Sequence, residues 1–280
     1  MATQTNSQLI VSTQQVASSD RVNIVASATN DGRPVTTQNP LPVTNITNVP
    51  IAAGLLEGYS AVHKFGMVKG TATSGWNTIW TGAEAAATIL YPWPVIGDAS
   101  VVTVVSSSGS DVTAVTLQGL DSNYDFQEET ITLTGVVPAT GTKVWHRVNR
   151  AFMVTQTNVG KITVRNANSV AITFIKEARG QTLQSLYTIP GGCTGFLNTI
   201  QMVASKAQSA EVSMFARPLG GAFRVVGGSV LYQMDHTIEY SSPVVLTEKT
   251  DIDVRVIGTS NADISCSFDL LIVSNAVLNS

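Results

Sequence analysis

The residues that most often carry enzyme chemistry are few in this sequence and lie far apart along it. The three histidines, His63, His146 and His236, fall in three different segments, and none has a second ligand at the short spacing of a metal-binding pair. A nucleophile elbow, a phosphate-binding loop and a dinucleotide fingerprint are all missing, because the glycine pairs at 191–192 and 220–221 are typical of β-turns. We therefore assign no catalytic, cofactor-binding or metal-binding residue and expect a protein that is not an enzyme.

Acidic and amide side chains near the middle of the chain come closest to a metal-binding pattern. Asp121, Asn123 and Asp125 have the opening spacing of a calcium loop. The sixth position of such a loop requires glycine and here holds Phe126, and the twelfth requires a bidentate acid and holds Thr132. We therefore interpret the segment as a turn in which short polar side chains bond their own backbone.

The remaining carboxylates do not indicate a reaction either. Glu128 and Glu129 are neighbours on an expected strand, so they point to opposite faces and cannot act as a paired acid and base. Asp251, Asp253 and Asp263 could suggest a cation site, but exposed strand and loop positions explain them more simply. We expect no chemistry from any of the five.

The cysteines also favour a structural interpretation. Cys193 and Cys266 lie far apart, and neither belongs to a paired-thiol motif. Cys266 occupies an inward position on an expected strand. A small buried hydrophobic residue is therefore favoured there over a disulfide or a nucleophile.

Aromatic side chains allow one binding function to be considered. Trp76, Trp80, Trp93 and Trp145 all fall in the same part of the chain, and carbohydrate-binding β-sandwiches use such rings as sugar platforms. Large aromatic residues more often fill a core or an interface. An open groove lined by Trp76, Trp93 or Tyr91 would argue for sugar binding, and burial of these rings would argue against it.

The elements that must position these residues are short β-strands. Thr130, Thr132 and Thr134 alternate with Ile131 and Leu133, which is the period of a half-buried strand. Further candidate strands, separated mostly by Gly, Asp, Asn and Ser, lie at 78–80, 100–106, 113–118, 144–148, 151–155, 161–164 and 171–175. Their spacing is typical of an antiparallel sandwich or jelly roll.

The C-terminal part has the clearest alternation. Apolar residues at 252, 254 and 256, and again at 264, 266 and 268, alternate with polar ones, so the register of both strands is well specified. Asn261, Ala262 and Asp263 lie between the two runs and predict a hairpin turn. Two earlier turns are expected at 190–192 and 218–221, each between two strands.

These patterns predict an all-β chain with four parts. We expect an extended N-terminal arm at 1–50, a connector at 51–74, a first antiparallel β-sandwich domain at 75–180 and a second at 181–280, both jelly-roll-like. Glycines in the connector disfavour a helix, so that at most a short turn is expected there.

The expected arm is polar and irregular. Pro34, Pro40, Pro42 and Pro50 block any long central strand and favour extended backbone. Its composition is compatible with two interpretations. One is a disordered tail, and the other is a strap that adds strands to the sheet edge of a neighbour through main-chain hydrogen bonds.

Charge is sparse and evenly mixed. Charged residues make up 12% of the chain, against roughly 25% in ordinary soluble proteins, and the net charge is −3. A surface with so little charge protects a monomer poorly against association, so we expect much of it to be buried against partners. A secreted β-protein rich in Ser and Thr is the alternative. No basic stripe is available to neutralise phosphates, which disfavours direct nucleic-acid binding.

Targeting signals are not recognisable. The first residues, MATQTNSQ, lack the cationic and apolar regions of a signal peptide, and no run of about 18 apolar residues predicts a membrane span. We therefore expect synthesis in a cytoplasm and no membrane partner.

Six strings of sequence carry a family resemblance: EGYSAVHKFG, VVSSSGSD, GLDSNYDFQEETITLTG, FMVTQT, GQTLQSLYTIPGG and LTEKTDIDVRV. Together they resemble a family of virion structural proteins of tailed bacteriophages, including marine and cyanobacterial ones, over roughly residues 54–275. The string GLDSNYDFQEETITLTG and the couple YTIPGG and EKTDIDVRV are the most specific parts. The family has no catalytic residues to transfer, so the resemblance implies membership in a virus particle and no cofactor.

Proteins of this kind that decorate heads resemble cement proteins, which are commonly trimers that bridge major capsid subunits. The resemblance therefore implies a capsid cement or decoration protein on the capsid surface, with the major capsid protein and further copies of itself, as a homotrimer, for partners. A tail, collar, baseplate or head-fibre component is the alternative within the same class. A carbohydrate-binding receptor module is the alternative from a different class.

Overall fold

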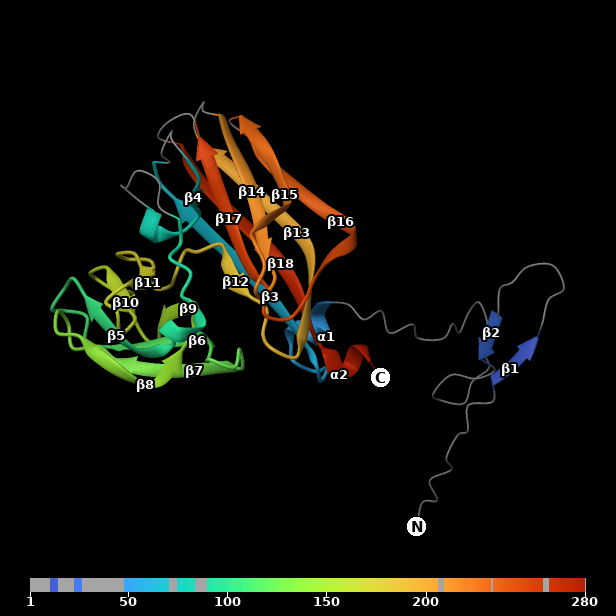
Figure 1. The fold of residues 1–280 in the computed structure, drawn as a ribbon, viewed down its shortest axis with the longest axis horizontal. Helices are drawn as coiled ribbons and strands as arrows, with labels where there is room; N and C mark the ends of the chain where they lie inside the picture. Colours follow the sequence, from blue (N-terminus) through green and yellow to red (C-terminus); the bar gives the residue numbers. More distant parts are fainter. Residues whose placement is uncertain are drawn as a thin grey trace, which may run out of the picture. The chain divides into compact units, whose positions relative to one another are not determined.

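The computed structural model describes residues 11–14, 23–26, 48–70, 75–83, 90–205, 209–232, 234–258 and 262–279 (Figure 1). Contacts divide the chain into two units, Met1–Pro50 and Ile51–Ser280. In the first unit, strands β1 (Val11–Gln14) and β2 (Asn23–Ala26) pair antiparallel. The rest of the expected arm, as far as the short helix α1 (Asn48–Ala52), lies outside the described residues.

The second unit contains an antiparallel β-sandwich that is built from one continuous stretch of the chain. Its strands are β5 (Ser100–Ser106), β6 (Ala114–Leu120), β7 (Phe126–Thr132), β8 (Ala139–Trp145), β9 (Arg147–Met153), β10 (Ile162–Arg165) and β11 (Ala171–Ile175). One sheet has the order β11-β10-β5-β8 and the other β7-β6-β9. Val102 and Val104 of the first sheet and Val115 and Leu117 of the second are fully buried in one shared core. The apolar residues that alternate along these strands therefore pack between the two sheets and hold them together.

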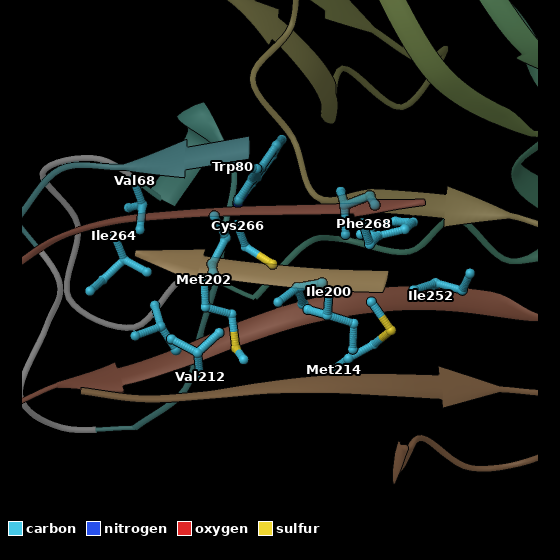
Figure 2. Close-up of a cluster of buried hydrophobic side chains, with 14 of the residues drawn as sticks. Val68, Trp80, Ile200, Met202, Val212, Met214, Ile252, Ile264, Cys266 and Phe268 are labelled. Carbon is cyan, nitrogen blue, oxygen red and sulfur yellow. The ribbon is translucent and has the colours of Figure 1, made fainter. Parts of the chain in front are cut away.

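A second antiparallel sandwich takes its strands from both sides of that stretch in the sequence. Its strands are β3 (Tyr59–Val68), β4 (Asn77–Thr78), β12 (Leu186–Thr188), β13 (Cys193–Ser205), β14 (Ser209–Arg217), β15 (Arg224–Tyr232), β16 (Asp235–Leu246), β17 (Asp251–Gly258) and β18 (Asp263–Ser274). One sheet has the order β12-β17-β14-β15, with β4 also on β17, and the other has the order β16-β13-β18-β3. Figure 2 shows Met202 and Phe268 of one sheet packed between the sheets with Met214 and Ile252 of the other. The prediction of an all-β fold with two sandwiches is confirmed.

Helical structure is minor among the described residues. Besides α1 it consists of two short 3-10 helices, η1 (Thr81–Ala83) and η2 (Ile96–Asp98), and of α2 (Asn275–Leu278) near the end of the chain. No helix in the described part of the chain has the length and apolarity that a membrane crossing needs.

The expectation of a simple connector at 51–74 is wrong for its second half. Residues Tyr59–Val68 form the ten-residue strand β3, which pairs with β18 along its whole length. Lys64, Gly66 and Val68 are its buried positions. Because two of these inward positions hold a lysine and a glycine, the sequence of β3 does not show the alternation of hydrophobic and polar residues that predicts a strand. The short strand β4, which covers part of the candidate strand at 78–80, likewise pairs with β17 of the second sandwich.

The hairpin expected at 261–263 is also wrong. Strand β17 pairs with β4, β12 and β14, whereas β18 pairs with β13 and β3, so the two alternating runs lie in opposite sheets. Their apolar residues meet across the core and not side by side, a difference that the alternation alone cannot reveal. The candidate strand at 144–148 similarly divides in two, because β8 ends at Trp145 and β9 begins at Arg147.

Other turns are confirmed. β14 and β15 form a hairpin in which the Gly221 amide donates to the Pro218 carbonyl at 2.8 Å, and Gly220 has a φ of +73°. Gly192, in the expected turn at 190–192, has a φ of +68°. A side chain is strained in that left-handed conformation, which explains glycine at both positions.

Candidate functional site: the junction of the two sandwiches

Strand β9 of the first sandwich and strand β17 of the second each begin with a charged residue, and these two residues meet. Arg147 donates twice to Asp251, from Nε to Oδ1 at 3.0 Å and from Nη2 to Oδ2 at 3.2 Å. The two side chains are 4% and 6% exposed. Because a two-pronged arginine–carboxylate pair fixes orientation as well as distance, this contact joins the sandwiches in one defined arrangement.

Both ions of this pair have further partners. Asp251 also accepts from Nη2 of Arg217, its neighbour across the strand pair, at 2.6 Å, and from the Thr188 hydroxyl at 2.6 Å. Arg147 donates Nη1 to the Pro94 carbonyl at 2.6 Å. A buried ion pair is tolerated when such hydrogen bonds replace the lost water, so the cluster is built to be stable in a dry environment.

A second buried carboxylate lies two residues along β17. Asp253 is completely buried and accepts from the Thr78 hydroxyl at 2.9 Å, from Nε1 of Trp93 at 3.0 Å and from Nε of Arg255 at 2.9 Å. Burial raises the pKa of the Asp253 carboxyl, and Arg255 and the two hydrogen-bond donors oppose the rise without reversing it. Within the described parts of the chain, Asp253 bonds buried or half-buried partners of its own sandwich and the segment before β5, and it anchors their side chains.

These positions correct the expectation that Asp251 and Asp253 are exposed on their strand. They do face away from the core that Ile252 and Val254 fill, but Trp93, Pro94 and Arg147 cover that face. Sequence analysis missed Arg147 and Arg217 because each contacts a residue far away in the chain. The available signal was three charged residues, Asp251, Asp253 and Arg255, at alternate positions of one strand, in a chain where only 12% of the residues are charged.

Arginines and aromatic rings alternate across the same face. Their order is Arg147, Trp93, Arg217, Phe223, Arg255 and Phe215. Each guanidinium carbon lies between 4.4 and 5.6 Å from the centroid of the neighbouring ring. Stacking of this kind holds a guanidinium flat while its edge donates to a carboxylate, so the rings and the two aspartates fix the arginines together.

The aromatic residues considered for sugar binding are used inside this structure. Tyr91 is 5% exposed and donates its hydroxyl to the Ile172 carbonyl at 2.9 Å. Trp93 has arginines against its ring, and Trp76 packs edge-on against Phe215 with centroids 5.4 Å apart. Trp80 and Trp145 are buried in the two cores. This arrangement argues against a sugar platform built from these rings.

A second set of contacts joins the sandwiches beside the ion pair. Lys64 of β3 donates to the Asn149 carbonyl of β9 at 2.5 Å. Gln184 donates to the carbonyls of Val148 and Asn149 at 3.1 and 3.0 Å. Burial, with a smaller contribution from Arg150, lowers the pKa of Lys64 from 10.5 to about 7. Lys64 and Gln184 both satisfy carbonyls of β9 that would otherwise face the neighbouring sandwich.

The strings of strongest family resemblance meet at this junction. Tyr124 lies in GLDSNYDFQEETITLTG, Gly191 in YTIPGG and Lys249 in EKTDIDVRV. The Gly191 amide donates to the Tyr124 carbonyl at 2.9 Å, and Nζ of Lys249 lies 5.5 Å from the Tyr124 ring centroid. His146 bonds the Tyr124 hydroxyl at 3.1 Å, and burial together with Arg147 lowers the pKa of His146 to about 4. Residues distant in sequence therefore share one task, which is holding the two sandwiches together.

The calcium-like segment is a turn built on a side chain, as predicted. One oxygen of Asp121, Oδ1, accepts from the backbone amides of Asn123 at 2.8 Å and of Asp125 at 2.9 Å. Glu128 and Glu129 take separate structural partners, as their positions on one strand predict. Glu128 accepts from Gln118 at 2.7 Å, and Glu129 accepts from the backbone and side chain of Thr142.

The histidines stay apart. His63 bonds Asp269, its cross-strand neighbour, at 2.5 Å, and His236 lies on β16, at the opposite edge of the same sheet. In the parts of the chain that the structure describes, no three His, Cys, Asp or Glu side chains gather as metal ligands would. Cys266 is buried and both cysteines are free thiols, which confirms the interpretation of Cys266 as a small buried residue.

Comparisons with known proteins give distant similarities. No family model and no curated protein matches the sequence. Among solved structures, a chain of infectious bursal disease virus strain Gx is 11% identical, with 79% of this chain and 73% of that chain covered and a TM-score of 0.24. A chain of the VP2 subviral particle of the same virus is 10% identical over the same shares, with a TM-score of 0.22. At these TM-scores the similarities carry no argument about function.

Proposed function

We propose that this chain is a non-enzymatic structural protein of a virus particle, and specifically a capsid cement or decoration protein of a tailed bacteriophage. One observation carries the proposal: the strings that resemble the virion family converge on the junction that locks two sandwiches together. The junction residues hold the two sandwiches in a fixed arrangement, and we assign them no part in a chemical reaction. A rigid protein with few surface charges is well suited to bind between the subunits of a larger particle, where much of its surface is buried.

The mechanism we propose is passive. The two locked sandwiches span the boundary between major capsid subunits, and further copies of this chain complete a homotrimer at each site. Many small contacts then act together, because each contact made raises the effective concentration of the next. Binding to the assembled shell stabilises the shell by mass action, without any chemical step. Neither nucleic acid nor membrane takes part.

A co-sedimentation experiment tests this function directly. Purified empty heads of the virus that encodes the chain are mixed with the purified protein and pelleted, with an unrelated β-sandwich protein of similar size as the control. We expect saturable binding to heads and higher resistance of loaded heads to heat. Absence of binding to heads, together with binding to isolated tails, would replace the cement role by a tail, collar or baseplate role.

The arm is tested in the same assay. A variant without residues 1–50 is checked for folding by circular dichroism and then mixed with heads. We expect its affinity for heads to fall at least tenfold, because the strap contributes main-chain contacts along a neighbour. Binding as tight as that of the complete chain would contradict the strap.

A further inference from the structure

Among the described strands, β15 is an edge strand that differs from the other edges. It pairs on one side with β14, and no described strand pairs with its other side. An unpaired edge presents a row of free amide and carbonyl groups that can accept a further strand. Natural edges are usually protected by charge, proline or short length.

The other edges of the sheets show such protection. β16 contains Asp235, Glu239 and Pro243, and the edge strands β3, β7, β8 and β9 each contain a Lys, Arg or Glu in the interior of the strand. β12 has three residues, and β11, which is uncharged, has five residues of which none is exposed. β15 has nine residues and one charge, at its first position, Arg224. Its register on β14 shifts at Val226, whose carbonyl accepts from the Tyr240 hydroxyl at 3.5 Å, so the regular open stretch of the edge is Gly227–Tyr232.

The side chains of β15 add to this contrast. Val225, Val230 and Tyr232 are 58%, 67% and 64% exposed. Their partners on β14 are Phe215, Glu211 and Ser209, whereas the partners of the intervening Gly227 and Leu231 are the core residues Met214 and Ala210. Val225, Val230 and Tyr232 therefore lie together on the outward face of the sheet, beside the open edge.

The N-terminal arm has the matching properties. Residues 1–19 contain no charged side chain, so a strand from this segment that pairs with β15 beyond Arg224 buries no ion. The structure gives extended strand conformation to Val11–Gln14 within that segment. That strand pairs with β2 alone in a two-stranded sheet, an arrangement that is marginal in water until a further strand is added.

Reach allows the added strand to come from another molecule. The 21 residues at 27–47 separate β2 from α1. At about 3.3 Å per residue, such a segment can span roughly 70 Å, which exceeds the diameter of one sandwich. A second copy of the chain is therefore within reach of the arm.

We propose that β15 is the acceptor edge for β1 of a second copy, which adds to the sheet as a further strand. This inference rests on the proposed self-association and names the surface that carries it. The interaction is heterologous, because the arm of each copy enters the edge of the next. Repetition around a threefold axis closes the ring and leaves no free acceptor edge.

Sedimentation velocity of the full-length protein over a range of concentrations tests the proposal. Val230→Lys places a charge at the open edge, and Val245→Lys is the matched control, on the protected edge strand β16 at a residue that is 60% exposed. In the arm, Thr13→Pro removes a backbone donor from β1, and Thr37→Pro, outside β1 and β2, is its control. Melting temperatures of all four variants are compared with that of the wild type to verify folding.

We expect Val230→Lys and Thr13→Pro each to raise the dissociation constant of self-association at least tenfold, and the double variant to add little, because both remove one contact. The two control variants associate like the wild type. The proposal is overturned if the Val230→Lys variant associates as tightly as the wild type, or if the wild type is monomeric at every concentration. It is also overturned if Val230→Lys abolishes association and Thr13→Pro does not. In the last case β15 pairs with another strand.

A cysteine pair identifies the occupant. Copies carrying Val230→Cys are mixed with copies that carry a cysteine at one position of β1 in turn, from Val11 to Gln14. A disulfide between unlike copies is expected at one or two of these positions, since the bond needs Cα atoms within about 7 Å. No such disulfide at any position would contradict the proposal. Because these assays use no virus particle, their failure is separate from a failure to bind heads.

Discussion

Replacing Arg147 by methionine tests whether the buried cluster holds the two sandwiches together. The side chain loses both hydrogen bonds to Asp251 and the bond to the Pro94 carbonyl, while its volume is largely kept. Removing one member of a buried ion pair costs about 3–5 kcal/mol. Asp251 keeps Arg217 and Thr188, so we expect the lower end, about 3 kcal/mol.

The assay is thermal and urea unfolding of the purified protein. For a folded unit of the size of Ile51–Ser280, about 3 kcal/mol corresponds to a fall in the melting temperature of roughly 6–12 °C. Arg165→Met is the matched control, because Arg165 is exposed and bonds only the nearby Ser169 carbonyl among the described residues. The control should change stability by about 0.5 kcal/mol or less.

A double-mutant cycle then assigns the effect to the pair. Arg147→Met, Asp251→Asn and the double variant are compared, and we expect a coupling energy of about 2 kcal/mol, within the range seen for residues in one buried network. A melting temperature for Arg147→Met within about 2 °C of the wild type, a shift below about 1 kcal/mol, would refute the reasoning. So would a coupling energy near zero, because the two side chains would then act independently.

Three further predictions follow from other contacts. Lys64→Met should remove one pH dependence. The folded pKa of Lys64, about 7, lies below the unfolded value of 10.5, so Lys64 makes wild-type stability rise between these pH values, by up to about 5 kcal/mol. In urea unfolding, the difference in stability between wild type and variant should change by that amount across the window, and an unchanged difference would contradict the prediction. Gly119→Ala should destabilise the protein by about 1–3 kcal/mol, because the added Cβ would lie 2.0 Å from the Arg147 carbonyl oxygen, whereas Gly97→Ala, with open space at the Cβ, should melt like the wild type. Cys266 should resist alkylation until the protein unfolds, because the thiol is buried and burial raises its pKa to about 12; native-state labelling of Cys266 detected by mass spectrometry would contradict this.

Period-two patterns were sufficient to predict the sandwiches and several strand bounds. The candidate strands at 100–106 and 171–175 are β5 and β11, and the Asx turn at Asp121 is as expected. These features depend on residues close together in sequence, which alternation and turn chemistry report directly. The choice of partner strand is not local, so β17 and β18 read as a hairpin although they lie in opposite sheets.

The junction could not be predicted for a related reason. Asp253 looks exposed on its strand, and it is buried because Trp93, some 160 residues earlier, lies over it. Lys64 looks like a surface lysine until β3 is placed beside β18 and its amine reaches β9. Both contacts depend on how one segment packs against another that is distant in sequence, and hydrophobic periodicity carries no information about that packing.

Imaging purified particles of the virus by cryo-electron microscopy tests the central claim most directly. The account predicts density for paired β-sandwiches at the joints between major capsid subunits, on the outer surface of the head and in hundreds of copies. Density confined to the tail in three, six or twelve copies, or particles that lack the protein altogether, would contradict it.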